Sequence, residues 1–213
     1  IFTAAYGHPR RFNYLLGLAL FILSLMLDFT GYVLRWDVDI CWPLTTGTNL
    51  LKTIPLIGDF LYRIAVGSGN ACETALLRFY TWHIFGLTIL VVILGFWHAF
   101  RVRRDGGIAV PPPQLRADAT RIPRDELVRR EVLTIFIVSI VLILLSSFIP
   151  APIAAAMTDK PSLTADARAP WFFLWVQQML KWGDPFIFGV LIPTSIFTFL
   201  ALIPYIFPQT ADA

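Results

Sequence analysis

Four long apolar stretches alternate with polar segments along the 213-residue chain. They cover approximately residues 14–34, 79–100, 132–156 and 185–207. Each contains roughly the ~20 apolar residues that a helix needs to cross the hydrocarbon core of a bilayer. The pattern therefore predicts an all-α integral membrane protein with four transmembrane helices.

Shorter amphipathic segments lie between the predicted spans. Residues 49–66 (NLLKTIPLIGDFLYRIAV) and 171–182 (WFFLWVQQMLKW) have apolar positions at helical spacing, which predicts helices lying along the membrane surface. Pro55 and Gly58 interrupt the first of them. The stretch that follows the second span is rich in Gly, Pro and charge and marks a boundary. It divides the chain into residues 1–104, a linker at 105–131, and residues 132–213.

Composition and charge support a membrane protein and suggest its orientation. The mean hydropathy is +0.69, and 57% of residues are hydrophobic while 15% are charged, values outside the range of soluble domains. No nucleic-acid-binding signature is present. Arginines gather before the first span and in the 101–131 loop, so the positive-inside rule predicts that both termini and this loop are cytoplasmic. Because the chain begins at Ile1 without a signal-peptide pattern, we expect it to be a fragment, a processed chain or part of a longer one.

Two cysteines, Cys41 and Cys72, fall in the predicted outer loop at 35–78. An outward compartment permits a disulfide between them, and a pair of unbridged buried thiols is the alternative. There is no CxxCH motif, so no covalently attached c-type haem is indicated.

Two histidines, His83 and His98, lie fifteen positions apart on the second apolar stretch. On a regular α-helix they would be ~22 Å apart along the axis and ~60° apart around it, so both can face one bundle interior. Ionisable groups inside a span are costly and usually mark function, and neutral imidazole is a common axial ligand of haem iron. The pattern predicts one ligand near each membrane surface. The alternative is a pair of histidines hydrogen-bonded between helices.

The first span carries Gly17 and Gly31, fourteen positions apart and on nearly one face. Glycines in a membrane helix allow close helix packing, and two at this spacing could also leave room for flat macrocycles at two depths. Asp28 lies near the outer end of the same span, either as a residue that reaches the interface or as a group that handles protons.

Several motifs carry a resemblance to a known family. They are FTGYVLRWD (29–37), TNLLKTIPLIG (48–58), LLRFYTWH (76–83) and PWFFLWVQQMLKWGDP (170–185). The sequence resembles cytochrome b of the cytochrome bc complexes, the quinol:cytochrome c or plastocyanin oxidoreductases. The likeness begins at the third transmembrane helix of that family and continues into a part resembling subunit IV.

The resemblance implies the ligands of two haem b groups. His83 would bind the outer haem iron and His98 the inner one, Gly17 and Gly31 would face the porphyrins, and Arg78 would partner a haem propionate. The fifteen-residue step is that of the split, photosynthetic-type cytochrome b. The family's opposite axial histidines are missing here, since the remaining histidine, His8, lies outside the spans. A preceding cytochrome b segment or a separate subunit is expected to supply them.

The resemblance also implies an outer quinol/quinone site, but its proton acceptor has changed. The family's P-E-W-Y glutamate is replaced by Pro170, and a proline has no group that can accept a proton. Arg35 replaces the proline of the family's L-P-W motif. Asp28, Asp166 or a partner's group are the candidate substitutes. The expected lining residues of this site are Tyr32, Trp42, Pro170, Trp171 and Phe172.

By this resemblance the chain is a subunit of a quinol:cytochrome c-type oxidoreductase that couples electron transfer to proton translocation. Electrons pass between quinol, a Rieske iron–sulfur protein and a c-type cytochrome or equivalent acceptor. The implied setting is a dimeric complex in a bacterial inner membrane. One alternative is a haem-bearing conduit or anchor of another respiratory or photosynthetic complex that has lost outer-site quinol oxidation. Another is a packing subunit without haem.

Overall fold

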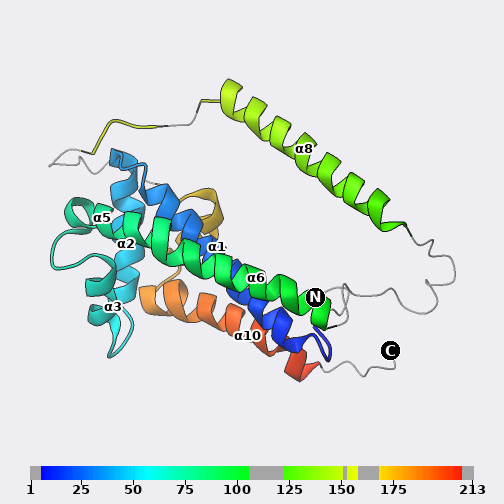
Figure 1. Ribbon diagram of the computed structural model, residues 1–213. Helices are drawn as coiled ribbons and strands as arrows, with labels where there is room; N and C mark the ends of the chain where they lie inside the picture. The colour runs from blue at the N-terminus through cyan, green and yellow to red at the C-terminus, as the bar shows by residue number, and fades with distance from the viewer. Residues whose placement is uncertain (1–5, 106–121, 151–152, 158–167, 208–213) are drawn as a thin grey trace. The chain divides into compact units, whose positions relative to one another are not determined.

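The computed structural model describes residues 6–105, 122–150, 153–157 and 168–207 (Figure 1). Within them, four helices are long and apolar enough to cross a membrane, and no strand is formed. This confirms the predicted all-α membrane protein. The first span is α1 (Arg11–Val33). The second comprises α5 (Leu76–Thr81), η2 (Trp82–Leu87) and α6 (Thr88–Arg104), the third is α8 (Arg124–Phe148), and the fourth comprises η4 (Ile187–Leu191) and α10 (Ile192–Ile206).

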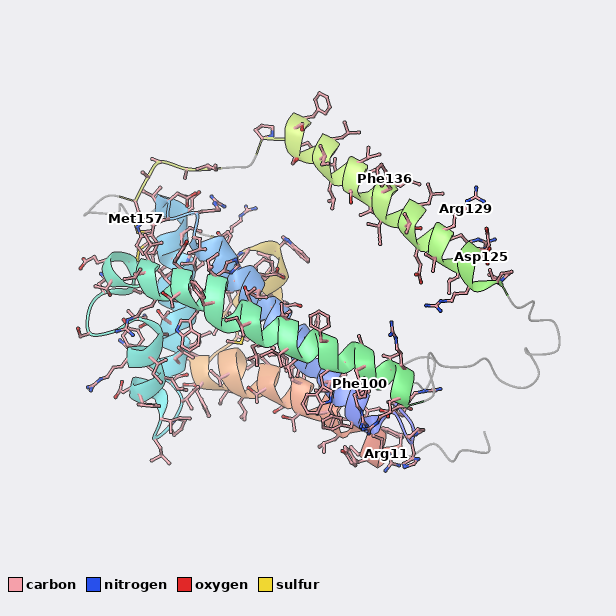
Figure 2. The ribbon with its side chains drawn as sticks, in the orientation of Figure 1. Arg11, Phe100, Asp125, Arg129, Phe136 and Met157 are labelled. Atoms are coloured by element: carbon pink, nitrogen blue, oxygen red, sulfur yellow. A yellow bond between two sulfur atoms is a disulfide. The ribbon has the colours of Figure 1, made fainter. Side chains whose placement is uncertain are left out.

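The third span lies earlier in the sequence than its hydropathy predicted, at 124–148 instead of 132–156. Pro123 precedes the helix, and Asp125 and Glu126 occupy its first turn, where acidic groups complement the helix dipole. The helix ends before Ile149, which is extended because it precedes Pro150. Figure 2 shows Asp125 and Arg129 near one end of α8 and Phe136 further along it.

The chain forms two compact units. Residues 1–109 and 154–213 make up one unit, and residues 110–153, whose described part is mainly α8, make up the other. In the first unit α1 packs against α6, η2 and α10, and the Tyr14 hydroxyl donates a hydrogen bond to the Leu200 carbonyl. The division into 1–104, 105–131 and 132–213 stays a prediction about domain organisation.

The segment between α1 and α5 is a folded cap of short helices. It contains η1 (Val38–Ile40), α2 (Cys41–Lys52), α3 (Gly58–Ala65) and α4 (Ala71–Thr74). Pro55 lies between α2 and α3, and Gly58 is the first residue of α3, so the interruption that the sequence predicted falls at residues 53–57. A disulfide joins Cys41 to Cys72, which is the first of the two alternatives. The cap buries a cluster of apolar side chains at the end of α1: Val33, Ile40, Leu44, Val66, Ala71, Ala75 and Phe79.

A buried carboxylate, Asp37, holds residues 154–157 against the segment that follows α1. The Asp37 side chain is 2% exposed and accepts hydrogen bonds from the Arg35 guanidinium and from the Ala154 backbone N–H. Backbone bonds from Val38 to Ala155 and from Met157 to Trp36 extend the contact. A buried charge is tolerated only when it is paired, and here it has a cation and an N–H as partners.

The segment after 168 returns to the membrane through η3 (Trp171–Phe173) and α9 (Leu174–Met179). These two helices fall within the segment 171–182 that the sequence predicted to be helical, and its placement along the membrane surface stays a prediction. The Asp184 carboxylate accepts hydrogen bonds from the backbone N–H groups of Phe186 and Ile187 and so satisfies donors at the start of the last span.

Candidate functional site

The two histidines of the second span face the two glycines of the first. A Cβ atom at Gly31 would lie 2.8 Å from His83 Cε1, and a Cβ atom at Gly17 would lie 3.2 Å from His98 Cε1. Both distances are shorter than ordinary van der Waals contact, so each imidazole occupies space that a side chain on α1 would need. The structure thus brings the four residues together as two histidine–glycine pairs at two levels of one helix interface. Figure 1 shows α1 and α6, the helices that carry most of this interface, side by side.

At the outer pair, a hydroxyl on α1 orients the imidazole. Thr30 Oγ1 lies 2.9 Å from His83 Nδ1 and 2.8 Å from the Met26 carbonyl oxygen. A carbonyl can only accept, so the Thr30 hydroxyl donates to Met26 and accepts from the Nδ1–H of His83. This tautomer leaves the Nε2 lone pair free, which is the form in which a histidine binds a metal.

At the inner pair, a ring nitrogen has no partner. His98 Nδ1 is buried and makes no hydrogen bond among the described residues. A buried polar atom without a partner is costly, which is a common mark of a site that binds another group.

These observations fit haem b. Each level offers one imidazole and, opposite it, a glycine with no side chain to fill the interface. The described residues supply one histidine at each level, because His8 is exposed and precedes α1. The second axial ligand of each iron would therefore come from outside this part of the chain.

Arg78, expected beside a haem propionate, lies against the loop between α3 and α4. Its guanidinium donates to the Ile64 carbonyl at 3.3 Å, and a Cβ at Gly67 would lie 3.1 Å from Arg78 Nε. Gly67 has φ +98°, a conformation that side-chain-bearing residues rarely adopt. Arg78 therefore anchors the cap, and a propionate contact stays a prediction.

A cavity of about 920 Å³ opens between α1, α2, the 169–181 segment and the last span. Of the expected outer-site residues, Trp42 and Pro170 line it, and Tyr32, Trp171 and Phe172 do not. Trp171 is 80% exposed, while Tyr32 packs against the buried cap cluster.

Sequence reasoning missed most of the residues that line this cavity. Phe29 and Phe173 meet there, with ring centroids 5.6 Å apart. The helical spacing of the lining positions after Pro170 could have identified them. Between Pro170 and the last span these positions are Phe173, Trp175, Val176, Gln177, Leu180 and Lys181, and all but Trp175 lie on one helical face.

The cavity is mainly apolar. Its polar side chains are four threonines, Gln177 and Lys181, and no carboxylate lines it in the part of the chain that the structure describes. Asp28 is exposed on α1 and is not among the lining residues. Asp166 lies outside the described residues. A general base for quinol is therefore not found among the described lining residues.

The fold and the site define a class of protein: a helical membrane protein with a histidine–glycine pair at each of two depths beside an apolar cavity. Residues 1–156 match the family described as Cytochrome b(N-terminal)/b6/petB, and the chain belongs to this family. It is 33% identical to cytochrome b6 of Euglena gracilis over 104 residues, which are 49% of this chain and 48% of that protein. The chain therefore spans about half the length of this curated relative.

Family membership and the apolar helices identify an integral membrane protein of electron transport, and the family implies that haem b is bound. The match ends at residue 156, so the likeness of the C-terminal part to subunit IV stays a proposal.

Proposed function

We propose that this chain is part of a membrane cytochrome b that passes electrons between quinol and a Rieske/cytochrome partner through two b-type haems. The observation that carries the proposal is the pairing of His83 with Gly31 and of His98 with Gly17, at two levels of one interface. A packing subunit without cofactor would have no need for an unpartnered imidazole nitrogen buried at this interface.

The chain's residues would hold one haem at each level. His83 would bind the outer iron through Nε2, with its ring fixed by Thr30, and His98 would bind the inner iron. Gly31 and Gly17 would let the imidazoles pack against α1 and would face the porphyrins, and Arg78 would partner a haem propionate. Each bound haem supplies a one-electron carrier. A preceding cytochrome b segment or subunit would supply the opposite histidines.

The cavity of about 920 Å³ is proposed as the quinol/quinone site. Its volume falls within the range of small-molecule sites, and its apolar walls suit a quinone ring and isoprenoid tail. Trp42 and Pro170 lie on its wall. The amide of Gln177, the ammonium of Lys181 and the hydroxyls of the lining threonines are the polar groups that could hydrogen-bond a quinol oxygen. Asp28, Asp166 or a group on a partner protein would take the proton, because Pro170 cannot.

A second candidate function is a haem-bearing conduit that no longer oxidises quinol at its outer site. The absence of a carboxylate among the described lining residues of the cavity favours it. Both candidates keep the histidine roles, and they differ only in the cavity.

The proposed setting follows the family and the charge pattern. The partners would be a Rieske iron–sulfur protein and a c-type cytochrome in a dimeric complex, with the C-terminal part acting as subunit IV does. The proposed membrane is a bacterial inner membrane, and the arginine distribution supports cytoplasmic termini.

The experiment compares three single-histidine variants of the protein purified with its natural partners. His83→Ala should remove the outer low-spin haem and His98→Ala the inner one, while His8→Ala, a control outside the spans, should retain both. A pyridine haemochrome assay and redox titration measure haem content. If the unaltered complex holds no haem b, the proposal fails. Quinol oxidation sensitive to outer-site inhibitors separates the first candidate function from the second.

A further inference from the structure

The two histidine–glycine pairs join helices whose residue spacings do not match. Gly17 and Gly31 are fourteen residues apart, and His83 and His98 are fifteen. In a regular α-helix one extra residue adds ~1.5 Å of rise and ~100° of rotation. Two regular helices side by side could not keep both pairs facing each other, yet both glycines lie against their histidines, with Cβ-to-Cε1 distances of 2.8 and 3.2 Å.

Only the second span departs from a regular α-helix to compensate for the one-residue difference between the two spacings. The first span is one uninterrupted α-helix from Arg11 to Val33. The second contains a π-helical turn, η2 (Trp82–Leu87), which includes His83 and ends eleven residues before His98. A π-turn takes in one extra residue without adding a helical turn. The fifteen-residue step then has nearly the phase of a fourteen-residue step.

Fourteen residues are two heptads, the repeat that keeps side chains on the seam of a left-handed helix pair. The two glycines are spaced by this repeat. The two histidines are one residue further apart, and they lie on the same seam because the π-turn takes in the additional residue.

Local contacts stabilise the turn. The Thr88 hydroxyl, five residues beyond His83, donates to the His83 carbonyl. The Trp82 indole covers Gly86, where a Cβ would lie 2.6 Å from Trp82 Cε3. Both contacts lie within the turn or at its end.

We infer that the π-turn at 82–87 is a positioning element that aligns His83 and His98 with the two glycines of α1. The inference rests on the proposed function in that the aligned imidazoles are haem ligands. It predicts an asymmetry between the helices. The second span can lose one residue at the turn and become a regular helix with both pairs intact, whereas α1 has no spare residue.

Two deletions test this asymmetry, each removing an exposed phenylalanine between the paired residues. Phe85 lies in the π-turn and is 59% exposed, and Phe21 lies on α1 and is 53% exposed. The complete protein with its natural partners is purified for each variant. Haem b per chain is measured by pyridine haemochrome, and the two low-spin haems are resolved by electron paramagnetic resonance.

Deletion of Phe85 should retain both low-spin haems at the level of the unaltered protein. Deletion of Phe21 should lose one, because it rotates Gly17 by ~100° relative to Gly31. Loss of a haem on deletion of Phe85 would overturn the inference. Retention of both haems on deletion of Phe21 would also overturn it, because α1 would then tolerate the loss of one residue as well as the second span does.

A high-resolution map of the unaltered complex keeps the inference testable if a deletion variant does not accumulate. A π-turn at 82–87 in that map supports the inference, and regular i→i+4 bonding from Leu76 to Arg104 overturns it. An unaltered complex with no haem contradicts the proposed function instead, and the map still decides whether the turn aligns the two pairs.

Discussion

His83 Nδ1 and Thr30 Oγ1 lie 2.9 Å apart, on two different membrane-spanning helices. Because Thr30 also donates to the Met26 carbonyl, its oxygen accepts from the imidazole and sets the ring's tautomer and orientation. The pair therefore couples the packing of α1 to the chemistry of the outer histidine.

Replacement of Thr30 by valine keeps the shape of the side chain and removes this acceptor. Loss of such a partner typically lowers metal affinity or activity by about 10–100-fold, so we expect weaker outer haem retention and a shifted midpoint potential. Redox titration of the purified complex measures both. Thr198→Val is the matched control, because the Thr198 hydroxyl donates to a carbonyl of its own helix. Identical titrations for the two variants would contradict the assigned role of Thr30.

Alanine at the glycines of α1 should displace the histidines, with the larger effect at the outer level. The added Cβ would lie 2.8 Å from the His83 ring at Gly31 and 3.2 Å from the His98 ring at Gly17. We expect Gly31→Ala to reduce outer haem content more than Gly17→Ala reduces inner haem content.

Gly95→Ala is the control, because a methyl group added there would meet no neighbouring side chain within 4 Å. It should retain both haems and stabilise the helix by about 0.5–1 kcal/mol. Haem content and thermal unfolding of the three variants check these expectations, and equal haem loss at Gly31 and Gly95 would refute them.

The bond between Cys41 and Cys72 should stabilise the cap. It closes a loop across a sequence separation of 31 residues, and removal of a disulfide typically costs about 2–4 kcal/mol. We expect Cys41→Ala/Cys72→Ala to lower the unfolding temperature of the complex. Treatment of the unaltered protein with a reductant should produce the same change and should leave the double variant unaffected. Equal melting of the oxidised and reduced unaltered protein would show that the bond contributes nothing.

Asp37 is expected to be the most sensitive carboxylate of the cap. Asp37→Ala leaves the Arg35 guanidinium and the Ala154 N–H without their common partner, and breaking a buried pair costs up to about 3–5 kcal/mol. Arg35 is 28% exposed, which reduces this cost. Asp39→Ala, at an exposed neighbouring carboxylate, is the control. Limited proteolysis and thermal unfolding measure the difference. Arg35→Ala/Asp37→Ala should be less destabilised than Asp37→Ala alone, and no such recovery would argue against the pairing.

A carboxylate at position 170 tests the proposed quinol cavity. Pro170→Glu would place a titratable group on the cavity wall, where burial raises carboxyl pKa values and a general base can add about 10²-fold or more to a rate. We expect faster quinol oxidation by the purified complex. Trp171→Glu is the matched control because Trp171 is exposed and does not line the cavity. An equal response of the two variants would remove the cavity from consideration as the quinol site.

Contiguous residues are enough to predict which parts of this protein cross the membrane and which side chains could bind a cofactor. The apolar runs predicted four spans, Pro55 and Gly58 predicted a break between two cap helices, and their spacing on one apolar span singled out His83 and His98 as ligands. These features are local, because hydropathy, helix-breaking residues and short motifs are properties of neighbouring positions in the chain.

Which residues meet is visible only in the folded chain. Folding joins Cys41 to Cys72, fastens Ala154 to Asp37, and brings Phe29 and Phe173, rather than Trp171 and Phe172, to the cavity beside Pro170. It also forms the π-turn at 82–87, which aligns histidines fifteen residues apart with glycines fourteen residues apart. Hydropathy does not predict such a turn, because the turn changes the helical phase of His83 and His98 without changing which residues are apolar. Its effect is seen only in the two pairs that the histidines make with glycines of a helix distant in the sequence.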